Sequence, residues 1–325
     1  ASALPVRVKN VAALQTAAVV IRVVRLNAAA TSVIRPHPVL IDNSPRKLGE
    51  IFFVPPDIIS WFVRTSVCCA GTLRYNQSMT AESAIDIQRL KTIGRICAET
   101  LRKMMGETRA GMTTRELDEI GRAFLEAEGA QSAPQRMYKF PGATCISVSP
   151  VIAHGIPNEY NLREGELIHI DVSAELDGYY ADTGASLIVS KRERSLERLL
   201  DATKAALTKA LRAAKAGNPL NGIGRTVQQE AGKRGYNVIY DLTGHGIGRK
   251  LHEEPKEILN YYDPNDRRIL NEGLVLAIEP FLTTGTGRVV QERDHWSLRT
   301  SDNTIAAQFE HTIIITRNEP IVLTL

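Results

Sequence analysis

The sequence predicts an α+β fold built from two related halves. In each half, segments with apolar residues at helical spacing precede segments that alternate like strands. An internal repeat links the halves, because Ala110-Gly111 and Gly129 recur 106 residues later as Ala216-Gly217 and Gly235. We therefore expect pseudo-symmetric halves with a site between them.

Helices are predicted at the start of each half. Apolar residues recur at helical spacing over Ser83–Met105, and a long helix over Ser195–Lys215 opens the second half in the same way. Thr113 and Glu116 form a capping-box signature for the next helix of the first half, and Gly129 suits its C-terminal end. Strands are expected to follow in both halves.

A β-hairpin is predicted around Asp177-Gly178, a dipeptide typical of a two-residue turn. Alternating segments on either side carry Asp171 and Asp182. With this turn, residue 173 faces residue 182, so Asp171 becomes the diagonal same-face neighbour of Asp182. Two such carboxylates are costly in an interior unless a cation lies between them, and a solvated hairpin face is the simpler alternative.

A glycine-rich segment carries two histidines. Residues 243–255 read TGHGIGRKLHEEP, with His245 between two glycines and His252 seven residues later. Glycines on both sides of a residue let the backbone approach a ligand closely. A lone histidine is more often a packed core or surface residue, but two histidines in one predicted glycine-rich loop favour chemistry.

Two glutamates interrupt apolar runs that otherwise read as strands. Glu279 follows LVLAI, and Glu310 lies inside AAQFEHTIIIT. A glutamate within such a run should be exposed or paired with a positive group. We therefore predict a ligand set of four carboxylates and one imidazole, which consists of Asp171, Asp182, His245, Glu279 and Glu310.

The chemistry of this set predicts two divalent cations bridged by hydroxide, because four carboxylates carry more negative charge than one ion balances. Hard oxygen ligands with one imidazole nitrogen suit Mn, Fe, Co or Zn better than Cu(I) or an iron–sulfur cluster. No thiolate is involved: Cys68, Cys69, Cys97 and Cys145 lack zinc-finger spacing and form no disulfide framework. Their number favours a reducing compartment.

Composition separates the N-terminal segment and excludes several classes of function. Residues 1–78 carry nine Lys or Arg against three Asp or Glu, and the rest of the chain carries 31 against 33. The body therefore lacks the basic excess of a nucleic-acid surface, and no apolar run is long enough to span a membrane. We expect 1–78 to be an irregular basic extension; a transit segment and a ribosome-facing arm are alternatives for it.

Together these motifs resemble those of type I methionine aminopeptidases. The resemblance runs from about Ile93 to Thr316, and it also rests on FPGATCISV from Phe140 and AHGIP from Ala153. It implies the pita-bread fold, in which two pseudo-symmetric halves surround a central antiparallel sheet, and a catalytic metallopeptidase domain over 79–325. It also implies removal of the initiator methionine from nascent chains, with a small residue preferred next to it.

The resemblance implies a role for each metal-site residue. Asp171 would be the terminal ligand of one metal, and Asp182 and Glu310 would bridge both metals. His245 and Glu279 would bind the second metal, and Glu279 would also transfer protons.

Other residues would act on the substrate without binding metal. The resemblance places His154 and His252 against the substrate and the reaction intermediate. It assigns the pocket for the methionine side chain to three residues, which are Phe140, Cys145 and Trp296.

Three residues near this pocket depart from the family's usual pattern. Leu251 stands where Phe is usual, and Pro134 and Met137 stand where Cys and Tyr are common. They leave the predicted metal ligands untouched but change the expected shape of the pocket.

Two other functions remain open at this point. An X-Pro aminopeptidase or prolidase would share the five ligands, and a non-catalytic pita-bread binding protein would be expected to have lost some of them. The resemblance implies a cytoplasmic monomer that acts on nascent polypeptide N-termini, with the ribosome as an alternative partner. An organellar location is the alternative if the extension is a transit segment.

Overall fold

The structure, a computed structural model, describes residues 81–325; the extension predicted for residues 1–78 lies outside them. In each half of this part of the chain, helices come first and a run of antiparallel strands follows, which confirms the predicted α+β class. None of its helices is both long and apolar enough to cross a membrane. The helices are α3 (Ala84–Glu107), α4 (Thr114–Ala127), α5 (Ala133–Tyr138), α6 (Arg194–Ala213) and α7 (Asn221–Lys233).

The strands are mostly short, apart from one long hairpin. Those of the first half are β1 (Gln131–Ser132), β2 (Cys145–Val148), β3 (Val151–Ala153), β4 (Leu167–Leu176) and β5 (Tyr179–Ile188). Those of the second half are β6 (Asn237–Val238), β7 (Thr243–Gly246), β8 (Glu253–Leu259), β9 (Val275–Ile278), β10 (Phe281–Thr283), β11 (Val289–Gln291), β12 (Leu298–Thr300), β13 (Ala306–Gln308), β14 (His311–Ile314) and β15 (Ile321–Val322).

Every strand pair within residues 81–325 is antiparallel. One sheet has the order β1-β4-β2, with β5 paired to β4, and a second has the order β15-β14-β9-β7-β8. A bridge between Ala185 on β5 and Phe309 joins the two halves. Smaller sheets, β13-β10-β6 and β11-β12-β3, complete the strands.

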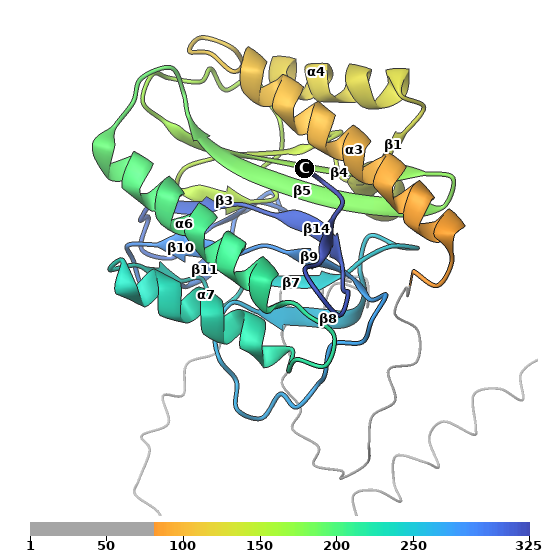
Figure 1. Ribbon diagram of the computed structural model, residues 1–325. Helices are drawn as coiled ribbons and strands as arrows, with labels where there is room; N and C mark the ends of the chain where they lie inside the picture. The colour runs from red at the N-terminus through yellow and green to blue at the C-terminus, as the bar shows by residue number, and fades with distance from the viewer. Residues whose placement is uncertain (1–80) are drawn as a thin grey trace, which may run out of the picture. The chain divides into compact units, whose positions relative to one another are not determined.

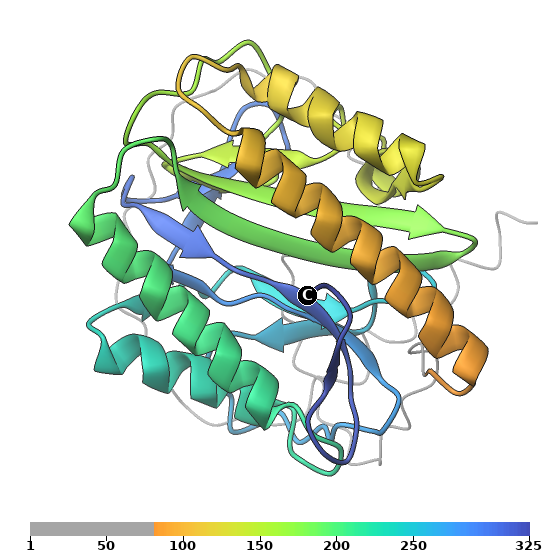
Figure 2. The same cartoon turned by 45° about the horizontal axis from the view of Figure 1, so that its top comes forward.

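The helices cover the strands in two matching pairs. Figure 1 shows α3 and α6 crossing the same face of the strands, and the turned view in Figure 2 shows the same arrangement. Helix α3 packs on β4 and β5, whereas α6 packs on β5, β9, β10 and β13. Helix α4 packs beside α3, and α7 packs beside α6.

The predicted internal repeat is present in the backbone. Gly111 and Gly217 have φ angles of 84° and 87°, and Gly129 and Gly235 have φ angles of 76° and 81°. Gly111 and Gly217 precede α4 and α7, and Gly129 and Gly235 follow these helices. The repeat confirms two pseudo-symmetric halves.

The repeat also relates two of the predicted metal ligands. Gly165 precedes β4 and Gly273 precedes β9, and both glycines have φ of 84°. The N–H of each donates, at 2.8 Å, to the first carbonyl after the partner strand, which is β5 for Gly165 and β14 for Gly273. Asp171 and Glu279 each follow six residues after these glycines. The two acids are therefore equivalent positions of the two halves, and both face the junction.

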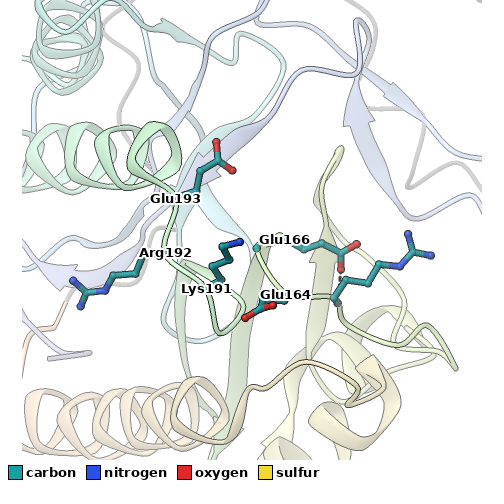
Figure 3. A pocket seen from close by; sticks show the side chains of 7 residues that line it. Glu164, Glu166, Lys191, Arg192 and Glu193 are labelled. Atoms are coloured by element: carbon teal, nitrogen blue, oxygen red, sulfur yellow. Dashed lines mark hydrogen bonds between the residues drawn. The ribbon is translucent and has the colours of Figure 1, made fainter.

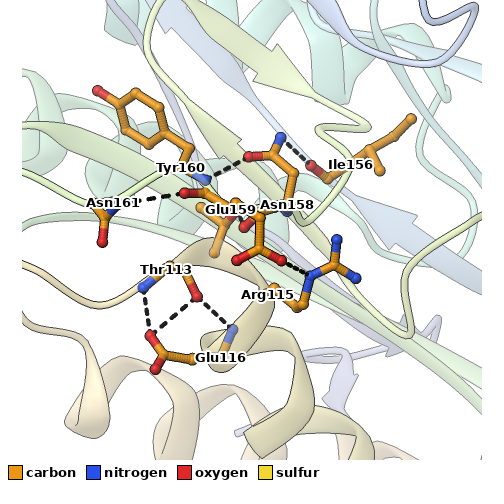
Figure 4. Close-up of polar contacts among 9 residues, drawn as sticks. Thr113, Arg115, Glu116, Ile156, Asn158, Glu159, Tyr160 and Asn161 are labelled. Carbon is orange, nitrogen blue, oxygen red and sulfur yellow. Dashed lines mark hydrogen bonds and ion pairs between the residues drawn. The ribbon is translucent and has the colours of Figure 1, made fainter.

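Capping interactions hold α4 where the sequence predicts. Figure 4 shows Thr113 and Glu116 bonded in both directions, with the Thr113 N–H 2.7 Å from the Glu116 carboxylate. The loop after His154 lies over this helix start, and the Arg115 N–H donates to the Asn158 carbonyl at 2.9 Å. This contact fixes the chain between His154 and β4.

Candidate metal centre

The β4–β5 hairpin places Asp171 and Asp182 as the sequence predicts. Ser173 pairs with Asp182, and the turn residues Asp177 and Gly178 have φ angles of 52° and 79°. Asp171 therefore lies diagonally across from Asp182 on one face. Asp182 is 6% exposed, so the alternative of a solvated hairpin face is wrong.

His245 comes from the second sheet. The sequence predicted a loop for both histidines, which is wrong for His245, because it lies in β7 and pairs with Ala277. A Cβ at Gly244 would lie 2.4 Å from the Ala277 carbonyl oxygen, and one at Gly246 would lie 2.2 Å from the Glu254 carbonyl oxygen. The two glycines are needed because neighbouring backbone presses on both sides of His245.

The sequence suggested that Glu279 and Glu310 lie within strands. In the structure, both lie just beyond strand ends. Strand β9 ends at Ile278, and Glu310 falls in the break between β13 and β14. The break has a physical cause: the Glu310 N–H donates to the Gly184 carbonyl on β5 at 2.9 Å instead of to a neighbour within its own sheet. The hydroxyl of Thr183 donates to the Glu310 carbonyl at 3.0 Å.

The five predicted ligands converge. One ligand atom each from Asp182, His245 and Glu310 lies within 4.8 Å of the other two. Nε2 of His245 is also 3.6 Å from Oε1 of Glu279. The Asp171 carboxyl completes the group, because it lies near enough to the Asp182 carboxyl to affect its pKa, from the diagonal position on the neighbouring strand.

Electrostatics in this cluster are unfavourable without a cation. Burial raises the pKa of Asp182, Glu279 and Glu310 well above their ordinary values, and the neighbouring carboxylates raise each pKa further. Burial also raises the pKa of Asp171. For His245, burial lowers the pKa to about 4, so the imidazole is neutral near pH 7 and cannot neutralise the acids.

The donor set fits divalent cations. Oδ1 of Asp171, Oδ1 of Asp182 and Oε1 of Glu310 are buried without a hydrogen-bond partner among the described residues. Such orphaned oxygens are rare in protein interiors unless an ion or water satisfies them. Nδ1 of His245 lies 3.0 Å from the Gly246 carbonyl, which leaves Nε2 as the free lone pair. The cluster is therefore a site for divalent metal.

Gln308 supports the site, although sequence reasoning missed it. Its side-chain amide donates to Oε2 of Glu310 at 3.2 Å, and its hydrogen bond also lowers the pKa of Glu279 against the effect of burial. Its position two residues before Glu310, in the same apolar run, could have indicated this role from the sequence. Gln308 is 1% exposed, so this contact is made away from solvent.

Gly184→Ala should displace Gln308 and weaken the site. A Cβ at Gly184 would lie 2.7 Å from both Oε1 of Gln308 and Cε1 of His169. Overpacking of this kind typically costs about 1–3 kcal/mol of unfolding free energy. We expect calorimetry to show that loss, and titration calorimetry to show weaker metal binding.

Gly232→Ala is the matched control for this prediction. Its Cβ would meet nothing within 4 Å, and it lies in α7. The control should gain up to about 1 kcal/mol from helix propensity. Equal stability and equal metal affinity for the two variants would show that Gly184 is not needed for packing at Gln308.

Two further histidines lie beside the cluster. The ring of His252 is 4.2 Å from the ring of His245, between centroids, and its Nδ1 is 2.6 Å from the hydroxyl oxygen of Tyr138. His154 follows β3 with φ of 55°, and it is close enough that its charge lowers the pKa of His245 and His252. Their predicted contact with substrate and intermediate stays a prediction, for which these positions beside the cluster leave them available. No sequence signal pointed to Tyr138.

Two of the three predicted pocket residues contact each other. Phe140 and Trp296 meet edge to face with centroids 5.2 Å apart. Cys145 is buried and lies directly opposite Asp171 on the neighbouring strand, so it is next to one of the candidate ligands. Cys145 therefore neighbours one candidate ligand, and Phe140 with Trp296 forms an aromatic edge.

The three departures from the family pattern have distinct surroundings. Leu251 is 3% exposed in the core, and Pro134 is buried in the first turn of α5. Met137 is 37% exposed, and its sulfur accepts from the Tyr180 hydroxyl at 3.5 Å. Only Met137 of the three offers its side chain to solvent.

A separate surface pocket has different chemistry. It has a volume of about 430 Å³, and both acidic and basic side chains line it (Figure 3). Its lining residues are Arg163, Glu164, Gly165, Glu166, Lys191, Arg192 and Glu193. It includes none of the five converging ligands, and its mixed charges indicate an ordinary solvated surface.

Two pseudo-symmetric α+β halves with a divalent-cation site at their junction define a pita-bread metallohydrolase. The chain belongs to metallopeptidase family M24, whose family model matches residues 88–317. It is 48% identical over 240 residues to methionine aminopeptidase 2 of Bacillus subtilis, a match that covers 74% of this chain and 96% of that protein.

Solved structures agree with this assignment. A methionine aminopeptidase from Rickettsia prowazekii superposes with a TM-score of 0.73 and 34% identity over 76% of this chain and all of that one. A prolidase from Pyrococcus furiosus, at 21% identity and a TM-score of 0.62, shares the fold over 76% of this chain and 66% of that one. The predicted pita-bread fold is confirmed.

Proposed function

We propose that this chain is a type I methionine aminopeptidase that removes the initiator methionine from nascent polypeptides in the cytoplasm. The observation that carries the proposal is the convergence of four carboxylates and one imidazole at the junction of the two halves. Similarity to methionine aminopeptidases supports the substrate class, and the FPGATC, AHGIP and LHEEP segments support type I.

Charge supports two bound ions rather than one. Four carboxylates balance two divalent cations, whereas one cation would leave the buried cluster with net negative charge. Asp171 and His245 approach the shared carboxyl of Asp182 from different sheets, which suits one ion on each side. We propose Mn, Fe, Co or Zn as the ions, with Asp182 and Glu310 shared between them.

When bound at these residues, divalent ions would supply a water of lowered pKa and would polarise the scissile carbonyl. Glu279, whose carboxyl is buried beside the cluster, would take a proton from the attacking water and pass it to the departing amide nitrogen. The water oxygen forms a bond to the carbonyl carbon, and the carbon–nitrogen bond then breaks. His252 donates a hydrogen bond to the carbonyl oxygen as it gains charge, and His154 orients the peptide nitrogen beyond the cleaved bond.

The methionine side chain is proposed to pack against Phe140, Trp296 and Cys145. A long, flexible thioether suits an apolar wall with an aromatic edge, since sulfur contacts aromatic rings favourably. The preference for a small next residue follows from the family resemblance.

A peptide assay tests this function directly. The metal-loaded protein should cleave Met-Ala-peptides and release free methionine, and it should leave X-Pro-peptides intact. Assays with Mn, Fe, Co and Zn in turn identify the ions that support turnover. Faster cleavage of X-Pro than of Met-Ala would favour a prolidase-type enzyme, and metal-loaded protein without activity on either would favour a binding role.

A further inference from the structure

Tyr138 lies at the rim of the metal centre on a restrained backbone. It is the last residue of α5, and Lys139 ends that helix in the left-handed conformation with φ of 59°. The Tyr180 hydroxyl on β5 contacts the sulfur of Met137, which ties the end of α5 to the hairpin. The Tyr138 side chain is 44% exposed, yet its hydroxyl reaches inward to His252.

The contact between Tyr138 and His252 is short and specific. The hydroxyl oxygen of Tyr138 lies 2.6 Å from Nδ1 of His252, with the ring centroids 5.5 Å apart. The two residues are 114 positions apart in the chain and belong to different halves. With Nδ1 occupied, only Nε2 of His252 is left for another partner.

The direction of this hydrogen bond follows from the chemistry of the two groups. A neutral imidazole carries one N–H, and the partner of each ring nitrogen decides which nitrogen holds it. Burial raises the pKa of Tyr138, so the phenol keeps its proton. A phenol is a stronger donor than a neutral imidazole, and imidazole nitrogen is the stronger acceptor. The O–H therefore donates to Nδ1, and the imidazole proton resides on Nε2.

His245 shows the opposite arrangement. Its Nδ1 faces the Gly246 carbonyl, an acceptor, so Nδ1 carries the proton and Nε2 is a bare lone pair. The two rings are 4.2 Å apart between centroids. His245 is therefore able to bind metal through Nε2, whereas His252 is able to donate a hydrogen bond from Nε2. The difference arises because each Nδ1 contacts a different group.

We propose that Tyr138 is a positioning residue that fixes His252 as an Nε2–H donor aimed at the substrate. The placing of the N–H rests on the hydrogen bond between Tyr138 and His252, whereas its benefit to catalysis rests on the proposed function. Tyr138→Phe keeps the ring and removes only the hydroxyl, so it isolates this contact.

Nitrogen-15 NMR of the metal-free protein tests the tautomer. The His252→Ala spectrum assigns the His252 signals among the histidines. In the wild-type protein, Nε2 of His252 should be protonated and Nδ1 unprotonated, and Tyr138→Phe should give a mixture of tautomers. A proton on Nδ1 in the wild type, or an unchanged ring in the variant, would overturn the proposal.

Kinetics with a Met-Ala-peptide test the consequence. Tyr138→Phe should lower kcat roughly tenfold, the worth of one hydrogen bond, with little change in KM and with full metal content. Tyr262→Phe, which contacts Arg225 and is 36% exposed, should keep wild-type kcat. Unchanged kcat for Tyr138→Phe, alongside a large loss for His252→Ala, would refute the positioning role. A wild-type protein inactive on Met-Ala would refute the proposed function, while the NMR result still decides the tautomer.

Discussion

Glu310→Gln should abolish peptide hydrolysis and, at the same time, stabilise the metal-free protein. Outer-shell substitutions at metal sites commonly cost about 10–100-fold in affinity or activity, so loss of a ligand should cost more than about a hundredfold. Metal analysis of the purified variant should show reduced content. Peptide assays at several metal concentrations would separate weakened binding from a slower reaction.

The stabilisation follows from the buried charge. In the folded metal-free protein, burial and Glu279 raise the pKa of Glu310, so folding near pH 7 must either protonate the carboxyl or hold a buried charge. Gln avoids this cost and can still accept from Gln308, so unfolding free energy should rise by about 1–3 kcal/mol. Calorimetry with a chelator present measures this difference.

Glu319→Gln is the matched control, because that carboxylate is exposed and pairs with Lys215 at 2.7 Å. It should leave activity, metal content and stability near those of the wild type, as surface ion pairs contribute little. The site assignment is wrong if Glu310→Gln binds metal and cleaves peptide like the control. A metal-free Glu310→Gln protein that melts earlier than the wild type would contradict the electrostatic argument.

Metal-free protein should lose stability as pH rises from 7 to 8. The pKa values of Asp182, Glu279 and Glu310 are raised in the folded state, so the stability these groups contribute is present at low pH and is lost as pH rises through the folded pKa values. Each proton that the folded protein binds and the unfolded chain does not lowers the free energy of unfolding by up to about 1.4 kcal/mol per pH unit.

The histidines act in the opposite sense at lower pH. Burial lowers the pKa of His245 to about 4 from an unfolded value of 6.5, so its contribution is present above 6.5 and is lost as pH falls. Between pH 7 and 8 its imidazole is largely neutral in both states, and the carboxyl slope should emerge. Saturating Mn should remove that slope, because the ions replace the protons, and Glu310→Gln should make it shallower. A melting temperature that is flat or rises with pH in chelator would contradict the cluster's electrostatics.

Sequence reasoning found the ligands because each was out of place locally. Asp171 and Asp182 follow from a turn dipeptide that sets register, and period-two alternation then brings the two acids to one face. Glu279 and Glu310 stood out as charges in apolar runs. The structure adds that Asp171 and Glu279 are equivalent positions of the repeat, which periodicity alone does not reveal.

What the sequence did not predict depends on contacts between distant segments. The break before β14 arises from a hydrogen bond between Glu310 and Gly184 across 126 residues, so a continuous strand was the natural expectation. Tyr138 stands in an ordinary helical setting, and only the folded chain brings its hydroxyl to His252. Local pattern therefore identified charged ligands, while the neutral groups that orient them required the structure.

Anomalous diffraction from crystals grown with Mn tests the central claim most directly. We predict two anomalous peaks among the carboxylates of Asp171, Asp182, Glu279 and Glu310, with Nε2 of His245 bound to one of them. Peaks at other residues, or none here at saturating Mn, would contradict the assignment of these five side chains.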